Sequence, residues 1–185
     1  PCGKLTDTIA ANVNDYPSAP YFGDPYRNFY SEDIYVGYRY FETFARDKVL
    51  YPFGFGLSYT TFDIAITGAK QLSDKWDFTV KVTNTGNYSG KEVVQIYCKA
   101  PQGRLGKPSR VLCGYEKTDT LAPGKSQVMT ISVSNAQIAS YDESGVTGHA
   151  HCFVLEEGTY RFYAGSDVRS AKEFYHCQQN STEVI

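Results

Sequence analysis

The chain has 185 residues and a net charge of −2, with 18 basic and 20 acidic side chains. This balance gives no electrostatic basis for binding nucleic acid or an anionic membrane, so we expect neither as a partner. Hydrophobic residues make up 42% and charged residues 21% of the sequence, which is typical of a globular protein and not of a disordered one.

Residues 1–28 carry turn signals and little else. Proline and glycine punctuate residues 15–20 and 23–25, as they do in loops. A loop of this length without a core of its own is uncommon inside a compact domain. We therefore expect this segment to pack on the surface of a larger domain, most of which lies outside the chain.

Residues 29–48 mix β-branched and aromatic side chains. Large apolar or aromatic residues recur at every second position, at Ile34, Val36, Tyr38 and Tyr40. A period of two predicts a short strand or an extended segment. One helical turn over residues 40–46 is the alternative.

Residues 49–62 join two differently patterned parts of the chain. Proline and glycines alternate there with four large rings, Tyr51, Phe53, Phe55 and Tyr59. Proline fixes φ and glycine frees it, so the pattern predicts a specified bend. Because each ring buries about 150–250 Å² when packed, we expect a covered crossing between two domains. In an isolated chain the first three rings would fold back, meet a second copy, or stay exposed.

From residue 59 onward the pattern is all-β. Turn signals separate runs that predict strands at residues 60–68, 76–83, 91–99, 109–117, 126–134, 149–155, 159–164 and 171–176. A single helical turn is expected at residues 135–141, with Asn135 as its N-cap. The fold class predicted is mainly β: an immunoglobulin-like sandwich of the fibronectin type III kind, preceded by an irregular aromatic-rich segment.

The five cysteines are widely spaced, at Cys2, Cys98, Cys113, Cys152 and Cys177. No C-x-x-C motif occurs, so a zinc ribbon or a thioredoxin-type site is not expected. Three of the five fall in predicted strands, where free cysteine behaves as a small apolar residue. This favours a reducing compartment, and we expect a cytoplasmic protein. Secretion is the alternative, although the first residues do not resemble a signal peptide.

Glu32 and Asp33 are adjacent carboxylates and therefore a candidate catalytic pair. Paired-carboxylate catalysis of the retaining kind needs two carboxyl groups about 5 Å apart that face one bond. Neighbours on an extended chain point to opposite faces. We expect a structural contact for both residues instead.

His149 and His151 stand two residues apart, so on a strand they would share one face. They could bind a metal ion with Asp142 or Glu143 as a third ligand. A two-ligand pattern is weak, and a polar strand face explains it equally, so no metal and no cofactor is predicted. His176 is the third histidine, and no G-x-S-x-G elbow accompanies it. The glycines of residues 54–56 do not continue into a phosphate loop.

Two stretches resemble the β-glucosidase type of family 3 glycoside hydrolases. They are YSEDIYVGYRYF (residues 30–41) and LYPFGFGLSYTTF (residues 50–62). Asp33 stands where relatives usually have glycine, and Phe55 where they have histidine. Shorter matches follow in the same order as in the family: PCGKL (1–5), NTG (84–86), GKEVVQIY (90–97), GYEK (114–117), LAPG (121–124) and SYD (140–142).

The resemblance implies a parent enzyme that hydrolyses terminal β-D-glucosyl residues with retention. It also implies that the Asp nucleophile lies on a barrel domain and the acid/base, usually a Glu, on an α/β-sandwich domain, both outside this chain. Residues 1–57 would end the α/β-sandwich domain, residues 58–177 would form the fibronectin type III-like domain, and residues 178–185 a tail. No catalytic residue is therefore assigned, and the substrate-binding residues are unknown.

The partners implied are the missing barrel and α/β-sandwich domains, on the same polypeptide or on a separate chain. The substrate of the parent would be a β-glucoside or an oligosaccharide. By itself the chain is expected to be inactive. Two readings stay open beside this one: a stand-alone β-sandwich that binds carbohydrate or protein, and a metal-dependent enzyme at His149 and His151. Homo-oligomer formation also stays open.

Overall fold

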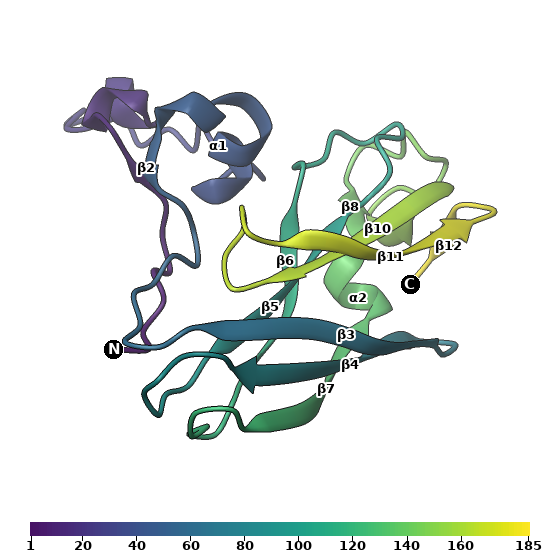
Figure 1. Cartoon of the computed structure of the whole chain (residues 1–185). Helices are drawn as coiled ribbons and strands as arrows, with labels where there is room; N and C mark the ends of the chain where they lie inside the picture. Colours follow the sequence, from purple (N-terminus) through teal and green to yellow (C-terminus); the bar gives the residue numbers. More distant parts are fainter.

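The computed structural model describes residues 1–185 as a small N-terminal lobe joined to a β-sandwich (Figure 1). The sandwich has two main sheets. One has the order β3 (Phe62–Gln71), β4 (Lys75–Asn84), β7 (Ser126–Ser134), and the other β11 (Lys172–Gln179), β10 (Gly158–Gly165), β5 (Val93–Lys99), β6 (Val111–Lys117). A third, smaller sheet has the order β12 (Glu183–Val184), β9 (Cys152–Leu155), β8 (Ser140–Asp142). The mainly β sandwich predicted from the sequence is confirmed.

The core lies between the two main sheets and is built from the alternating faces of the strands. In β4, residues 76, 78, 80 and 82 are buried, as a period of two requires. Phe78 of β4 meets Phe162 of β10 at 5.0 Å between ring centroids, and Trp76 meets the same ring at 5.5 Å. Aromatic contacts across the two sheets therefore fix their separation at the centre of the core.

Strand β5 departs from this alternation because both of its faces are covered. Residues 94–98 are all buried. Val94, Ile96 and Cys98 face the sandwich core. Tyr97 instead belongs to a second, smaller cluster that includes Phe53 from the N-terminal lobe. The outer face of β5 is therefore the place where the lobe meets the sandwich.

The lobe consists of short elements around a two-stranded sheet. Its elements are β1 (Ile9–Ala10), the 3₁₀ helices η1 (Val13–Asp15) and η2 (Ala19–Tyr21), α1 (Tyr38–Phe44), η3 (Arg46–Lys48) and β2 (Val49–Tyr51). The chain rises along β1 and returns antiparallel to it along β2 (Figure 1). Below this sheet the pairing continues, since Leu5 N donates to Phe55 O at 2.8 Å and Gly54 N donates to Leu5 O at 2.9 Å.

The strand predicted around residues 34–40 is wrong, because α1 occupies Tyr38–Phe44, and the helical turn given as the alternative at residues 40–46 falls largely within this helix. Gly37, with φ of +58°, sits before the helix in a conformation that favours glycine and turns the chain into it. The helix buries Phe41 and Glu42. The tertiary contacts of the helix face that carries Phe41 and Glu42 therefore outweigh the alternating pattern.

None of the helices in the chain is long and apolar enough to cross a membrane.

Two smaller corrections concern the C-terminal half. The N-cap of α2 (Asn135–Ile138) is Ser134 and not Asn135, because Ser134 and Gln137 form a reciprocal capping box. The strand expected from residue 149 begins only at Cys152. The remaining predicted strands are present, and their ends shift by about three residues at most.

Candidate functional site

The candidate functional site is the junction between residues 1–57 and the sandwich. Its centre is Phe53, which stacks on Tyr38 of α1 at 4.4 Å between ring centroids and meets Tyr97 of β5 edge-on at 6.5 Å. The carbonyl of Phe53 also accepts a hydrogen bond of 3.1 Å from Val168 N. Of the rings predicted in the crossing, Phe53 therefore folds back onto the sandwich, whereas Tyr51 and Tyr59 remain exposed.

A buried amide holds the crossing chain against β5. Gln95 Nε2 donates to Ser166 O at 2.7 Å and, more weakly, to Gly54 O at 3.5 Å. The Tyr97 hydroxyl donates to Gln95 Oε1. Burial raises the pKa of Tyr97, so this hydroxyl stays a donor. Gly54 has φ of +81°, and a Cβ there would collide with the Gln95 amide, so the close approach requires glycine.

A charged cluster joins α1 to the turn between β10 and β11. The buried carboxylate of Glu42 accepts from Arg169 Nε at 2.8 Å and pairs with Arg46 Nε at 3.2 Å. Arg169 Nη2 also donates to the carbonyl of Arg46 at 2.7 Å. Ser109 Oγ, from the loop before β6, donates to Glu42 O at 2.9 Å. One end of α1 is thus bonded to two separate loops of the sandwich.

Arg110 strengthens the same junction from within the sandwich. Its guanidinium lies 4.2 Å from the ring centroid of Tyr163 and donates to the carbonyls of Val168 and Ala171. Burial lowers the pKa of Arg110 from its usual value. The arginine thereby fixes the loop whose Val168 amide bonds to Phe53.

The structure does not bring the sequence-predicted carboxylates together as a pair. Glu32 accepts a hydrogen bond of 3.2 Å from Ser18 Oγ, within the lobe. Asp33 adopts a positive φ of 48° and lies at the rim of a cleft. The sequence reasoning also missed the functional contacts of Glu42, Gln95 and Arg169. No local signal could have found them, because Glu42 and Arg169 are 127 positions apart.

The histidine pair does not lie on one face of a strand. His149 and His151 belong to the loop before β9, and His151 has φ of +58°. The carboxylate of Asp142 accepts from the amides of Gly145 and Thr147 and from the Thr147 hydroxyl. No group of three metal-ligating side chains occurs in the chain. The expectation that the two histidines share one face of a strand is therefore wrong, because β9 begins only at Cys152.

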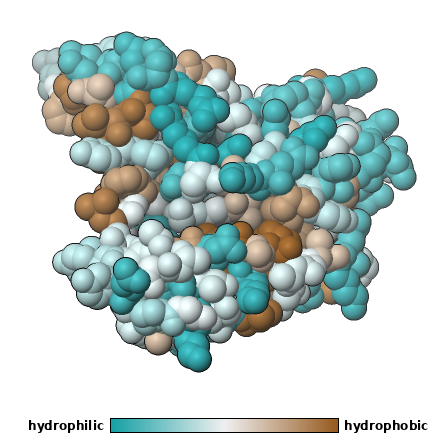
Figure 2. Space-filling view, in the orientation of Figure 1, coloured by the Kyte–Doolittle hydropathy of each residue, from teal (hydrophilic) through white to brown (hydrophobic).

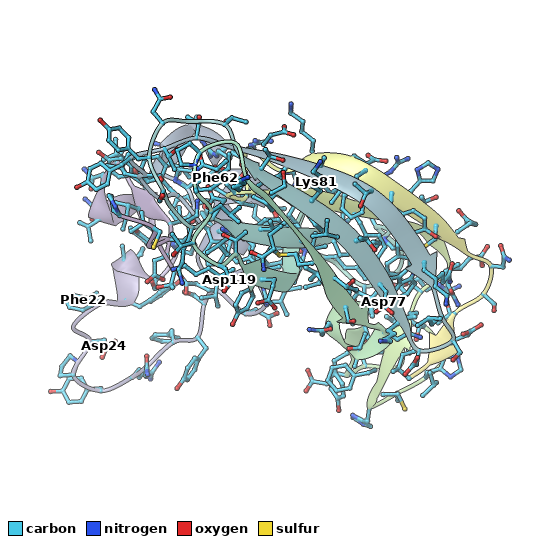
Figure 3. The ribbon with its side chains drawn as sticks, turned by 60° about the horizontal axis from the view of Figure 1, so that its bottom comes forward. Phe22, Asp24, Phe62, Asp77, Lys81 and Asp119 are labelled. Atoms are coloured by element: carbon cyan, nitrogen blue, oxygen red, sulfur yellow. The ribbon has the colours of Figure 1, made fainter.

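The outer surface of the lobe carries large apolar side chains that are exposed to solvent. Figure 2 shows brown, apolar residues gathered on the lobe at the upper left. Phe22, Tyr26 and Tyr30 are each about nine-tenths exposed. Figure 3 shows Phe22 and Asp24 on a loop that projects away from the rest of the molecule. Further exposed apolar residues of the lobe are Val13, Val36, Phe44, Leu50 and Leu57.

Comparison with known proteins places the chain within larger ones. A family model described as a fibronectin type III-like domain matches residues 92–168. A β-glucosidase of Ruminococcus albus is 56% identical over 185 residues, which is all of this chain but 19% of that protein. β-Glucosidase A of Butyrivibrio fibrisolvens is 46% identical, again over all of this chain and over 24% of its own length.

Solved structures agree with these relatives. The crystal structure of a β-glucosidase from Paenibacillus barengoltzii matches with a TM-score of 0.96 and 49% identity, over 100% of this chain and 21% of that chain. The match includes the N-terminal lobe as well as the sandwich, so the junction belongs to the shared architecture. The chain spans about a fifth to a quarter of the length of these relatives. The chain belongs to the family 3 glycoside hydrolases of the β-glucosidase type, as the region that ends in their fibronectin type III-like domain.

Proposed function

We propose that the chain is a non-catalytic portion of a retaining β-glucosidase, in which it fixes the fibronectin type III-like domain to the end of the α/β-sandwich domain. The observation that carries the proposal is its alignment over its whole length with about a fifth of a β-glucosidase. The buried junction at Phe53, Gln95 and Glu42 supplies the physical means. In the parent enzyme the nucleophile and the acid/base act from other domains.

The exposed apolar surface of the lobe supports this assignment. Monomeric soluble proteins seldom expose contiguous apolar patches larger than a few hundred square ångströms. The strands β1 and β2 form a sheet of only two strands, which is marginal in water and leaves backbone groups free to pair. Both features fit a lobe that completes a larger α/β-sandwich domain on the same polypeptide.

A chimaeric enzyme tests the proposal. The matching segment of the Ruminococcus albus β-glucosidase is replaced by this chain, and hydrolysis of an aryl β-glucoside is measured. We expect the chimaera to retain activity, because the chain matches the replaced segment over its whole length at 56% identity. The 185-residue chain alone is expected to give no turnover above a buffer blank. Turnover by the isolated chain would overturn the proposal, and so would a folded but inactive chimaera.

The competing hypothesis is that the exposed apolar surface of the lobe binds a second copy of the chain. It predicts a dimer or larger species of the isolated chain by analytical ultracentrifugation. The dimer would be lost when Phe22 and Tyr26 are replaced by serine. The proposed function instead predicts that these substitutions lower the activity of the chimaera by weakening the contact with its other domains.

We also propose a cytoplasmic location for the parent enzyme. The five cysteines are all unpaired, and Cys98 and Cys113 are buried as small apolar side chains. Such free thiols fit a reducing compartment. Cell fractionation that recovers the enzyme in the culture medium would support the alternative, secretion.

A further inference from the structure

A cleft of about 560 Å³ lies where the lobe, the loop after β5 and the β8–β9 region meet. Its volume is within the range of small-molecule sites. Its apolar lining residues include Ala100, Val111 and Ile138. Because the lobe supplies part of its rim, the cleft exists only when the junction is formed.

One wall of the cleft is an exposed aromatic pair. Tyr141 of β8 and Phe153 of β9 are cross-strand neighbours with ring centroids 5.1 Å apart. The two residues are 49% and 54% exposed, so a large share of each ring remains open to a ligand. Rings in this position offer a flat apolar surface to whatever enters.

The rim carries charged groups of both signs without partners in the chain. The guanidinium of Arg39 and the carboxylates of Asp33 and Glu143 make no hydrogen bond or ion pair within the molecule. Asp33 is held in a left-handed conformation with φ of +48°, which is costly for a residue other than glycine. Strained residues of this kind cluster at ligand sites.

Another part of the lining, residues 105–108, belongs to a loop that is held in place. The loop of residues 101–108 is fixed by the buried ion pair between Lys107 and Glu156. Glu156 Oε1 also accepts from Arg104 N at 2.7 Å. A Cβ on Gly106 would lie 3.2 Å from the hydroxyl of Tyr35, so the lobe and this loop approach each other closely. A preformed site loses less entropy on binding.

We propose that this cleft binds a β-linked gluco-oligosaccharide. A pyranose ring places its C–H face on an aromatic ring, and its hydroxyls both donate to carboxylates and accept from a guanidinium. The mixed charges of Asp33, Arg39 and Glu143 disfavour a strongly anionic or cationic ligand. The choice of ligand rests on the proposed function, since the parent enzyme would act on β-glucosides. The proposal assigns this cleft a role in binding and no role in catalysis.

Titration of the ¹⁵N-labelled chain with cellotriose tests the proposal by NMR. We expect amide shifts confined to residues around 33–39, 105–108, 137–144 and 153. The Tyr141→Ala variant is expected to bind about tenfold more weakly, as loss of one aromatic contact implies. Arg39→Ala, which leaves the apolar lining residues unchanged, is expected to weaken binding as well.

Tyr88→Ala is the matched control, because Tyr88 is 66% exposed and lies on the β4–β5 loop, outside the cleft. It is expected to bind as the unchanged chain does, and the spectra themselves report whether each variant is folded. Absence of shifts with cellotriose, or equal weakening by Tyr88→Ala, would overturn the inference. Neither result would affect the proposed function, which the chimaera tests through aryl β-glucoside hydrolysis.

Discussion

Gln95 and Tyr97 lie on the face of β5 that points away from the sandwich core, yet both are buried. They are polar because they bond to each other and to the chain that crosses over them. A buried amide that loses its donor keeps the cost of leaving water without the compensating bond. These two residues therefore make the docked position of the crossing segment specific as well as favourable.

The Tyr97→Phe substitution isolates this effect. It removes the donor to Gln95 Oε1 and leaves the ring in place, so we expect a loss of about 1–3 kcal/mol in the free energy of unfolding. Urea denaturation measures the loss. Tyr115→Phe, at an exposed position on β6, should change stability by no more than about 0.5 kcal/mol. Equal stability of the two variants would show that the Gln95 amide finds another donor.

The stability of the fold at low pH should depend on the ionisation of Asp142. Its carboxylate caps the loop before β9 by accepting from Thr147 Oγ1 at 2.6 Å and from the amides of residues 145–147. The hydrogen bond from the Thr147 side chain is the largest cause that lowers the pKa of Asp142 from 3.8 to about 2. The folded state therefore favours the ionised form over the unfolded chain.

A carboxyl with a depressed folded-state pKa stabilises the protein above its unfolded pKa, and the contribution is lost as pH falls through the folded value. For Asp142 the window runs from about pH 4 down to about pH 2. We expect Asp142→Asn to be less stable than the unchanged chain at pH 6, with the difference shrinking across that window. Asp63→Asn, at an exposed position on β3, should show no such convergence in the same urea titrations.

At the scale of elements, the loop between β5 and β6 depends on one buried ion pair. Lys107 Nζ bonds to Glu156 and to the carbonyl of Pro101 at 3.0 Å, and both charged side chains are almost fully buried. The pair crosses from this loop to the end of β9. The loop is consequently held as one body with the smallest sheet of the sandwich.

Removing one charge of the Lys107–Glu156 pair should lower the stability of the protein much more than removing both charges. Lys107→Met leaves the Glu156 carboxylate buried and unpaired, and a loss of about 3–5 kcal/mol is expected in chemical denaturation. Adding Glu156→Gln keeps an oxygen for the loop amides and should recover part of that loss. Lys125→Met, at an exposed turn, is the control. A double variant no more stable than Lys107→Met would contradict this account.

At the scale of the whole molecule, two lobes are held together by contacts between distant parts of the chain. The carboxylate of Glu42 in α1 and the guanidinium of Arg169 beyond β10 are the clearest case. They act with the stacked rings of Tyr38 and Phe53. The junction combines apolar burial with a few directional bonds, as a fixed interdomain contact requires.

Glu42→Gln should loosen the lobe without unfolding the sandwich. Loss of the charged pair is expected to cost about 1–3 kcal/mol locally, which speeds hydrogen exchange of α1 amides by about tenfold or more. Amides of β4 in the sandwich core should be unaffected. Glu157→Gln, an exposed residue, should change neither set. Uniformly faster exchange across both lobes would mean that they unfold as a single unit.

Much of the fold was predictable because strand alternation and turn chemistry are local. The buried positions 76, 78, 80 and 82 of β4 follow from steric and hydrophobic periodicity alone. The motifs at residues 30–41 and 50–62 likewise identified the family. The predicted division at residues 57 and 58 stays a prediction. The strand predicted over residues 34–40 is wrong because the burial of Phe41 and Glu42 favours the helical alternative over the local alternating pattern.

The sequence by itself determined the mainly β class, the positions of most strands and the family. Only the tertiary structure decided what covers Gln95 and Tyr97, which arginine meets Glu42, and that His149 and His151 lie in a loop. The physical reason is the distance along the chain over which each interaction acts. Backbone preference and side-chain alternation act between near neighbours, whereas buried polar groups find partners only after the topology has brought remote segments together.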